Sequence, residues 1–548
     1  MKRARALEIA GVCAVFAAAI AAIHPRGNFP LNDDGLYALP TFEFAATGKF
    51  HMTMMSPSLR AQIVWGALWV RAFGATYDTL RLCTIVTAVA TVAMFNALVA
   101  QTPMPRIGRI IVTLAFAFHP IFLWSSCTFM TEVHFVFCCV TAVYFYVRGF
   151  REQRAGFLIA GCVAVAISWW IRQTGLITAF PAIVFLLLYR QHLSRRWVRD
   201  LAICIAPVVL FAIVHRFWPD TLVGNAIELE TLTHQWREST WRLPQITAWT
   251  YHTSAWSLET TALMFLPIIV GLRLRASARR DKLVIAAMAV LMAIGTVVWL
   301  SDHIPLPHYG LVGINNYTGG DIFMNFGLGP PTLPNGFNGK IPYPIYIPYA
   351  ARVVLTLIVD VAAVVLLAAL VFAVLDRWRA PRENAMLFLC ILFAGAHTAS
   401  LTISGAYFDR YALTSQWTLG AAAAVLVPWD RVSARAASIA LLVCLAAFDI
   451  AATREYFAWQ TARWTAWSEL RRAGVPVRDI QGGSETYGVY ELAYVNDLHV
   501  RRRMAITSRD YHYAIEFGPR EKYHVIARHP FTGWFGLHRG EVLTLEKD

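Results

Sequence analysis

The chain has 548 residues, of which 57% are hydrophobic and 15% are charged, and it carries a formal net charge of +14. Its mean hydropathy is +0.49. This apolar content is higher than a soluble domain needs, so the composition excludes a soluble globular enzyme and indicates a helical protein with many membrane spans. Membrane topology explains the positive charge, and no basic segment has the form of a nucleic-acid-binding motif, so no nucleic-acid partner is expected.

About thirteen apolar segments are long enough to cross a bilayer, whose hydrocarbon core of about 30 Å takes roughly 20 helical residues. They lie near residues 7–23, 79–99, 108–124, 130–147, 156–171, 175–189, 198–217, 250–272, 283–300, 350–375, 384–404, 411–428 and 434–453. The arginine-rich stretches between them fall on alternate sides of successive spans, and therefore on one face, which the positive-inside rule assigns to the cytoplasm. The first segment has features of a cleaved signal peptide, but the many spans after it favour an uncleaved one. The sequence thus predicts a multi-pass protein of the plasma membrane, specifically a bacterial inner membrane, with a cytoplasmic N-terminus.

The longest polar stretches then face outward, at residues 24–78, 301–349 and from 454 onward. In the tail, "WTAWSELRRAGVPV" predicts a helix that Gly474 and Pro476 stop, and "KYHVIAR" and "GEVLTLEK" alternate as strands do. We therefore expect an all-α transmembrane domain over 1–453 and a small periplasmic α/β domain over 454–548. The nine cysteines lie in or beside the spans, which predicts neither a disulfide framework nor a CxxC metal site.

Ionisable side chains gather at the outer ends of several spans. Such groups are costly near membrane depth, so they are candidates for function. Asp33, Asp34, Lys49 and His51 follow the first span, Glu132 and His134 enter the fourth, Arg172 leaves the fifth, His303 follows the ninth, and Asp409 and Arg410 enter the twelfth. Structural alternatives exist, because Asp33 could cap a helix, Glu132 could face a helix dipole, and the arginines could be interfacial anchors.

Five stretches carry a resemblance to a known family. They are "NDDGLYALPTFEFAATGKF", "SPSLRAQIVWGALWVRAFGATYDTLRL", "SSCTFMTEVHF", "RQTG" and "FDRYAL". Together they resemble the integral-membrane glycosyltransferases that use polyprenyl-phosphate sugars, the GT-C fold, near the protein mannosyltransferase and lipid A aminoarabinose transferase branches. The sequence departs from that pattern at Glu132, where an aspartate is expected, and at "MSPSL", where a His-Pro-Pro stretch is common.

The resemblance implies an inverting transfer of a sugar from a polyprenyl-phosphate carrier to a hydroxyl or amine of a glycan, lipid or protein acceptor. The catalytic carboxylate is placed on Asp33, with Asp34 second, acting as general base, and Glu132 is expected to orient the acceptor. Arg172, Arg410 and Lys49 are expected to hold the donor phosphate. Further substrate-binding candidates are His51, His134, Tyr37, Asp409 and His303. This chemistry names no certain cofactor, and a divalent metal, Mg²⁺ or Mn²⁺, is an alternative partner for Glu132.

A second hypothesis is a secondary transporter or flippase for a lipid-linked or amphipathic anion. Transporters place polar groups near the membrane midplane. Two such groups, Asp360 and Asp449, lie within expected spans, whereas the more numerous ionisable groups lie at the outer rim. A third, a scaffold whose tail binds a partner, leaves the charges of the short outer loops without a role.

Overall fold

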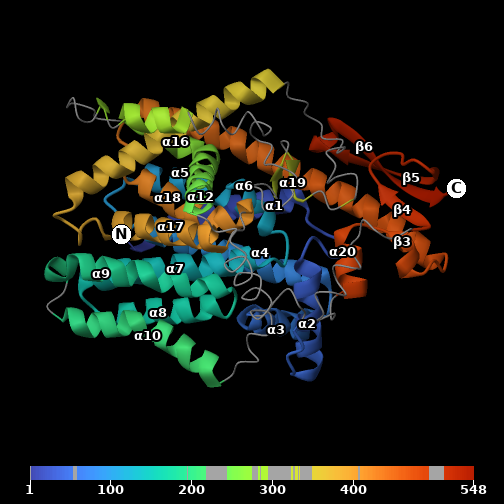
Figure 1. Cartoon of the computed structure of the whole chain (residues 1–548), viewed down its shortest axis with the longest axis horizontal. Helices are drawn as coiled ribbons and strands as arrows, with labels where there is room; N and C mark the ends of the chain where they lie inside the picture. Colours follow the sequence, from blue (N-terminus) through green and yellow to red (C-terminus); the bar gives the residue numbers. More distant parts are fainter. Residues whose placement is uncertain are drawn as a thin grey trace.

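A computed structural model describes most of the chain. It covers residues 2–52, 58–193, 196–217, 243–273, 282–293 except 284, 322–330 except 325 and 326, 333, 349–404, 408–492 and 511–548. The described part is mostly helical, with a small mixed sheet near the C-terminus (Figure 1).

Eight helical segments within these ranges are long and apolar enough to cross a membrane. They belong to α1 (Lys2–Ile23), α4 (Tyr77–Val99), α7 (Thr131–Glu152), α9 (Phe180–Leu193) with the 3-10 segment η1 (Gln173–Ala179) before it, α10 (Trp197–Phe217), α16 (Tyr349–Arg377), α17 (Ala385–Ser404) and α19 (Val432–Arg472). The fifth and twelfth expected spans form shorter helices, α8 (Ala155–Trp169) and α18 (Asp409–Ala424). The described residues thus support a multi-pass protein with eight candidate membrane helices instead of the expected thirteen.

Two expected spans are broken. The segment 108–124 divides into α5 (Arg106–Ala117) and α6 (Pro120–Ser125), because Pro120 lacks an N–H and forces His119 into an extended conformation with ψ 123°. The segment 250–272 divides at Phe265 into α12 (Leu243–Met264) and α13 (Leu266–Ile269). The ninth expected span, 283–300, lies partly outside the described residues.

Two short helices follow the first span. α2 (Asp34–Thr47) ends at Gly48, whose φ of +72° suits a glycine. α3 (Arg60–Phe73) buries Gln62 and Ile63 on one face and exposes Trp65, Leu68 and Phe73 on the other. An exposed aromatic and aliphatic face on a short helix is typical of a helix that lies in a membrane surface.

The C-terminal region continues directly from the last membrane helix. α19 is 41 residues long and passes the expected domain boundary at 454 without a break. It ends just before Gly474, which has a φ of +86° and was the predicted stop. Beyond it lie β3 (Ile480–Gln481), α20 (Ser484–Tyr487), the π-helical turn η4 (Gly488–Leu492) and three longer strands.

These strands are β4 (Tyr513–Glu516), β5 (Tyr523–Gly533) and β6 (His538–Lys547), in the sheet order β3-β4-β6-β5. β3 and β4 are parallel, and the other pairs are antiparallel. The strands predicted over 522–528 and 540–547 are confirmed as parts of β5 and β6. The sheet, α20, α2 and α3 gather at one end of the helix bundle, opposite the N-terminus (Figure 1).

A continuous apolar core lies between the helices. Its largest fully buried side chains include Phe95 of α4, Phe116 of α5, Phe122 of α6 and Trp417 of α18. The ring of Phe116 stacks on Phe95 with 4.3 Å between centroids and also contacts Phe122. This packing fixes α4, α5, α6 and α18 against one another, and so fixes the position of the first turn of α18.

Candidate active site

The loop between α1 and α2 is held in place by the buried Arg81 of α4. The Arg81 guanidinium donates hydrogen bonds to the carbonyl oxygens of Gly27 and Phe29 and to Asp78, and it lies over the Phe29 ring at 5.1 Å. A guanidinium has five donors in a fixed plane, so one side chain can fix several turns of a loop. The loop therefore delivers Asp33 and Asp34 to the start of α2 in a defined orientation.

The two adjacent carboxylates have different surroundings. Asp34 is fully buried and accepts hydrogen bonds from the backbone N–H groups of Leu31, at 2.5 Å, and Phe129, at 3.4 Å. Burial raises the pKa of Asp34 to about 7, against the opposing effects of Arg81 and these two donors. The Asp34 carboxylate thus stabilises the conformation of the loop between α1 and α2.

Asp33 occupies the N-cap position of α2, but its side chain makes no capping hydrogen bond. Instead, Asp33 Oδ2 accepts a hydrogen bond from Arg410 Nη2 at 3.0 Å, and its side chain stays 21% exposed. The alternative that Asp33 serves as a helix cap therefore has no support in the geometry. Its carboxylate is the more exposed of the pair.

Glu132 and Arg172 form a second ion pair. Glu132 lies in the first turn of α7, where the helix dipole favours a carboxylate, and its side chain is 3% exposed. Arg172, between α8 and η1, donates from Nη1 to Glu132 Oε1 at 2.8 Å and to Thr131 Oγ1 at 3.1 Å. Arg172 thus points into the protein and is not an interfacial anchor.

Arg410, in the first turn of α18, joins the two pairs. Its Nη2 contacts Asp33, and its Nε lies 4.0 Å from the same Glu132 oxygen that Arg172 binds. The ring of Tyr411 lies 4.5 Å from the Arg172 guanidinium carbon and 5.3 Å from that of Arg410. We call Asp33, Glu132, Arg172 and Arg410 the charged cluster. Its formal charge sums to zero, and its members come from four segments far apart in the sequence.

The other candidates from the first outer loop lie along α2. Tyr37, one turn after Asp33, is buried, and burial raises its pKa well above the ordinary value, with the Asp33 carboxylate adding to the rise. Tyr37 therefore lies within electrostatic range of Asp33. Lys49 and His51 follow the opposite end of α2, about 20 Å along the helix, and His51 pairs with Glu43 at 3.3 Å.

The remaining candidates have local partners or fall outside the described residues. Buried His134 lies against Cys83, with 4.0 Å between Nε2 and Sγ, and against the Phe129 ring. The Asp409 carboxylate accepts a hydrogen bond from the backbone N–H of Ile322 at 3.1 Å, and it is fully buried. Asp409 thus ties α18 to the start of a two-residue strand, β1 (Phe323–Met324), which pairs with β2 (Gly327–Leu328). His303 lies outside the described residues.

Sequence reasoning missed two contributors to this site. Tyr411, which lies under both guanidinium groups, follows Arg410 directly in "FDRYAL", so its position was visible in the sequence. Arg81, which holds the loop, lies at the start of an apolar span, and its nearest carboxylate in the sequence is Asp78, three residues before it. That spacing predicts only a local ion pair on the helix, so the sequence does not show that Arg81 also binds the loop before α2.

The donor set of the cluster does not fit a divalent metal. Mg²⁺ and Mn²⁺ are bound by several oxygen ligands, usually with more than one carboxylate. Both carboxylates of the cluster already face arginine, and no group of three or more His, Cys, Asp or Glu side chains with metal-binding spacing occurs in the described ranges.

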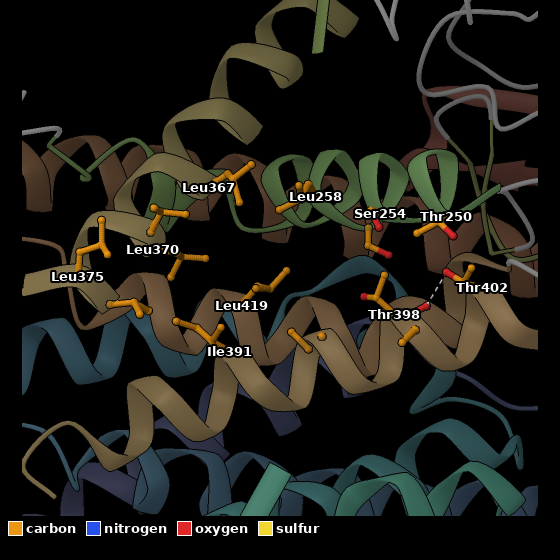
Figure 2. A pocket seen from close by; sticks show the side chains of 16 residues that line it. Thr250, Ser254, Leu258, Leu367, Leu370, Leu375, Ile391, Thr398, Thr402 and Leu419 are labelled. Carbon is orange, nitrogen blue, oxygen red and sulfur yellow. Dashed lines mark hydrogen bonds between the residues drawn. The ribbon is translucent and has the colours of Figure 1, made fainter. Parts of the chain in front are cut away.

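A cavity of about 450 Å³ lies between α12, α16, α17 and α18. Figure 2 shows that hydroxyl side chains line one end and leucines the other. The hydroxyl end includes Thr250 of α12 and Thr398 and Thr402 of α17, whereas Leu370 and Leu375 of α16 line the apolar end. Because Thr402 lies in the last turn of α17, the polar end points toward the same end of the bundle as Arg410.

Comparisons with known proteins give structural similarity alone. No family model and no curated protein matches the chain. The chain is similar to the crystal structure of ArnT from Cupriavidus metallidurans bound to undecaprenyl phosphate, with 12% identity, a TM-score of 0.37, and coverage of 98% of this chain and 97% of that one. It is also similar to the archaeal oligosaccharyltransferase AglB from Archaeoglobus fulgidus in complex with an inhibitory peptide and a dolichol-phosphate, with 11% identity, a TM-score of 0.41, and coverage of 85% of this chain and 59% of that one. Both fall in the group to which the sequence resemblance pointed, but similarity this low transfers no activity.

Proposed function

We propose that this protein is a membrane glycosyltransferase that moves a sugar from a polyprenyl-phosphate carrier to a hydroxyl or amine of an acceptor. The observation that carries the proposal is the charged cluster, in which two arginines and two carboxylates from four segments meet at one end of the helix bundle. A buried site that offers guanidinium groups beside a partly exposed carboxylate has the two functions that this transfer needs, phosphate binding and proton removal.

The arginines suit the phosphate of the donor. Guanidinium forks match phosphate oxygens with two parallel hydrogen bonds, and Arg172 and Arg410 already share one carboxylate oxygen of Glu132. A phosphate at this place competes with Glu132 and Asp33 for the same donors. Negative charge grows on the phosphate oxygen as the bond to the sugar breaks, and the two guanidinium groups stabilise that charge.

Asp33 is the proposed general base. Its side chain is 21% exposed, whereas Glu132 is 3% exposed and Asp34 is buried among backbone donors. The acceptor oxygen or nitrogen attacks the anomeric carbon, Asp33 takes its proton, and the bond from that carbon to the phosphate oxygen breaks. One such displacement inverts the anomeric centre. A positioned base contributes about 10²- to 10⁴-fold to the rate of such a step.

The surroundings of the cluster suit a lipid-borne donor. The exposed apolar face of α3 supports a location at the membrane surface. The cavity beside α17 and α18 has a polar end toward Arg410 and an apolar end lined by leucines, which suits an isoprenoid chain with a phosphate head. The distribution of arginine in the sequence favours a site on the periplasmic side of a bacterial inner membrane.

The proposal is tested by transfer of radiolabelled sugar from membrane-extracted polyprenyl-phosphate sugars by the purified protein. Asp33→Asn should lower the rate by about 10²- to 10⁴-fold while phosphate binding by Arg172 and Arg410 is retained. Asp430→Asn, an exposed carboxylate change near the opposite end of α18, is the control. Full activity of Asp33→Asn, or no transfer by the wild type from any donor pool, contradicts the proposal.

A lipid flippase is the second candidate, and Asp449 favours it. This residue of α19 is fully buried, and within the described residues its carboxylate oxygens accept no hydrogen bond. Ionisable groups inside a span often mark a transport path. A flippase would move fluorescent polyprenyl phosphate across proteoliposomes at a rate that Asp449→Asn lowers and Asp33→Asn leaves unchanged.

A further inference from the structure

We propose that the C-terminal region positions the Asp33 carboxylate through the buried ion pair of Glu485 and Arg463. This inference rests on the proposed function, because it assigns a role relative to Asp33. Glu485 belongs to α20 and Arg463 to the last third of α19, and both lie more than four hundred residues away in the sequence from the loop that Glu485 contacts.

The contact with the loop is made one residue before Asp33. The backbone N–H of Asn32 donates a hydrogen bond to Glu485 Oε1 at 3.1 Å. Asn32 has a φ of +53°, in the left-handed region, which asparagine adopts more readily than most other residues. The chain turns sharply at this point, so the direction in which Asp33 leaves the turn depends on how Asn32 is held.

Arg463 fixes the other oxygen of Glu485. Its Nη2 lies 2.7 Å from Glu485 Oε2, and neither side chain is exposed to solvent. The same guanidinium donates to the carbonyl oxygen of Gly482, from Nε at 2.8 Å and from Nη2 at 2.6 Å, and to Gln460. Glu485 is thus held from the α19 side in one orientation, with its second oxygen directed at the loop.

Apolar contacts lie on both sides of this hydrogen bond. Before Asn32, the Phe29 ring stacks on Trp464 of α19 at 6.0 Å between centroids, with 12° between the planes. After it, Gly35 of α2 lies so close to Val489 that an added Cβ would approach Val489 Cγ2 to 2.4 Å. The segment therefore packs against α19 at Phe29 and against η4 at Gly35.

Two side chains from different parts of the protein bind this loop. Arg81 of the membrane bundle binds the carbonyl oxygens of Gly27 and Phe29, whereas Glu485 of the C-terminal region binds Asn32, nearest to Asp33. Glu485 and Arg463 are positioning residues, because they act on Asp33 through the backbone. Since a displacement of about 1 Å at a reacting group can cost roughly 100-fold in rate, loss of this hold should lower turnover more than donor affinity.

The test compares Glu485→Ala, Arg463→Met and Glu485→Gln with a control, Glu455→Gln, in the detergent-purified full chain. Glu455 is a carboxylate of α19 that accepts hydrogen bonds from Trp534, between β5 and β6, and from His538 of β6, and its hydrogen bonds within the described residues do not reach the loop. Glu485→Gln keeps a carbonyl oxygen for Asn32 and removes the charge that faces Arg463. Glu485→Gln therefore separates the effect of the hydrogen bond to Asn32 from the effect of the ion pair with Arg463. It also replaces Glu485→Ala in the comparison if the alanine variant does not fold.

Two readouts are taken, hydrogen exchange of the amides in residues 27–36 and the steady-state constants for sugar transfer. We expect Glu485→Ala and Arg463→Met to speed exchange in this segment and to lower kcat by about 10- to 100-fold, with KM for the donor within about twofold. Glu485→Gln should stay within about fivefold of wild type in kcat. Exchange and kcat equal to those of Glu455→Gln overturn the proposal.

The two readouts keep this proposal separate from the proposed function. If the wild type transfers no sugar, the function fails, and hydrogen exchange still decides whether Glu485 holds the loop. If the wild type transfers sugar and the Glu485 and Arg463 variants match the control in both readouts, the positioning role fails while the function stands.

Discussion

Replacing Glu132 with glutamine removes one charge from the charged cluster and keeps the shape of the side chain. Glu132 Oε1 lies 2.8 Å from Arg172 Nη1 and 4.0 Å from Arg410 Nε. With an effective dielectric constant of about 20, these separations correspond to attractions of about 6 and about 4 kcal/mol. Desolvation offsets much of this attraction. Removing one partner of a buried ion pair typically lowers the free energy of unfolding by about 3–5 kcal/mol.

The same substitution should tighten the binding of a lipid phosphate. The cluster changes from neutral to a net charge of +1, and the carboxylate no longer competes for the guanidinium groups. A phosphate about 5 Å from the former carboxylate avoids a repulsion of about 3 kcal/mol, which corresponds to roughly 100-fold in Kd. Because solvent and side-chain movement reduce this value, we expect polyprenyl phosphate to bind at least about tenfold more tightly.

Two measurements on detergent-purified protein check this reasoning. Glu132→Gln should unfold at a lower temperature than wild type without ligand, and saturating polyprenyl phosphate should raise its Tm by more than it raises that of wild type. Glu152→Gln, at the other end of α7 and paired with Arg148 at 2.7 Å, is the matched control. Equal or weaker phosphate binding by Glu132→Gln would show that the two arginines do not form an anion site.

Three further outcomes are expected. Burial in the folded protein raises the pKa of Asp34 from 3.8 to about 7, so the folded state binds this proton more tightly than the unfolded state. The free energy of unfolding should therefore fall by up to about 4 kcal/mol as pH rises from about 4 to about 7. Thermal unfolding of Asp34→Asn should show a smaller pH dependence. Gly395 lines the cavity beside α17, and an added Cβ there meets nothing within 4 Å; Gly395→Leu should therefore raise KM for long polyprenyl donors and leave KM for short-chain donors unchanged. A Cβ on Gly175 would lie 2.4 Å from the backbone of Ser168, so Gly175→Ala should displace Arg172 and lower transfer, with Gly156→Ala as a control at an open position.

Much of the candidate site was predictable because alternate spans end on the same side of a membrane. That rule places Asp33, Glu132, Arg172 and Arg410 at one level, and the described structure brings all four together. The rule says nothing about which helices are neighbours within that level. It therefore could not separate these residues from Lys49, which lies at the far end of α2.

Other features depend on contacts that a sequence does not display. Asp33 and Asp34 are adjacent and identical, and their partners distinguish them, since Asp34 accepts hydrogen bonds from the backbone of Leu31 and Phe129 whereas Asp33 pairs with Arg410. The hydropathy of the sequence predicts that the last span ends near residue 453, because the residues beyond that point are more polar. The backbone of α19 nevertheless stays helical to Arg472. A helix that leaves the membrane without a break has no signal in hydropathy, so the link from α19 to the loop through Arg463 was not visible.

The length of α19 has a consequence for the role of the lipid bilayer. A helix of 41 residues is about 61 Å long, roughly twice the thickness of a hydrocarbon core of about 30 Å. The apolar half of α19 adjusts its tilt to the hydrophobic thickness of the bilayer. The other half carries Arg463 and Trp464, which help to position the Asp33 loop. Because one continuous helix joins the membrane to the Asp33 loop, the acyl-chain length of the lipids is expected to affect the position of the Asp33 carboxylate. Transfer measured in vesicles of thin and thick lipids is therefore expected to pass through an optimum.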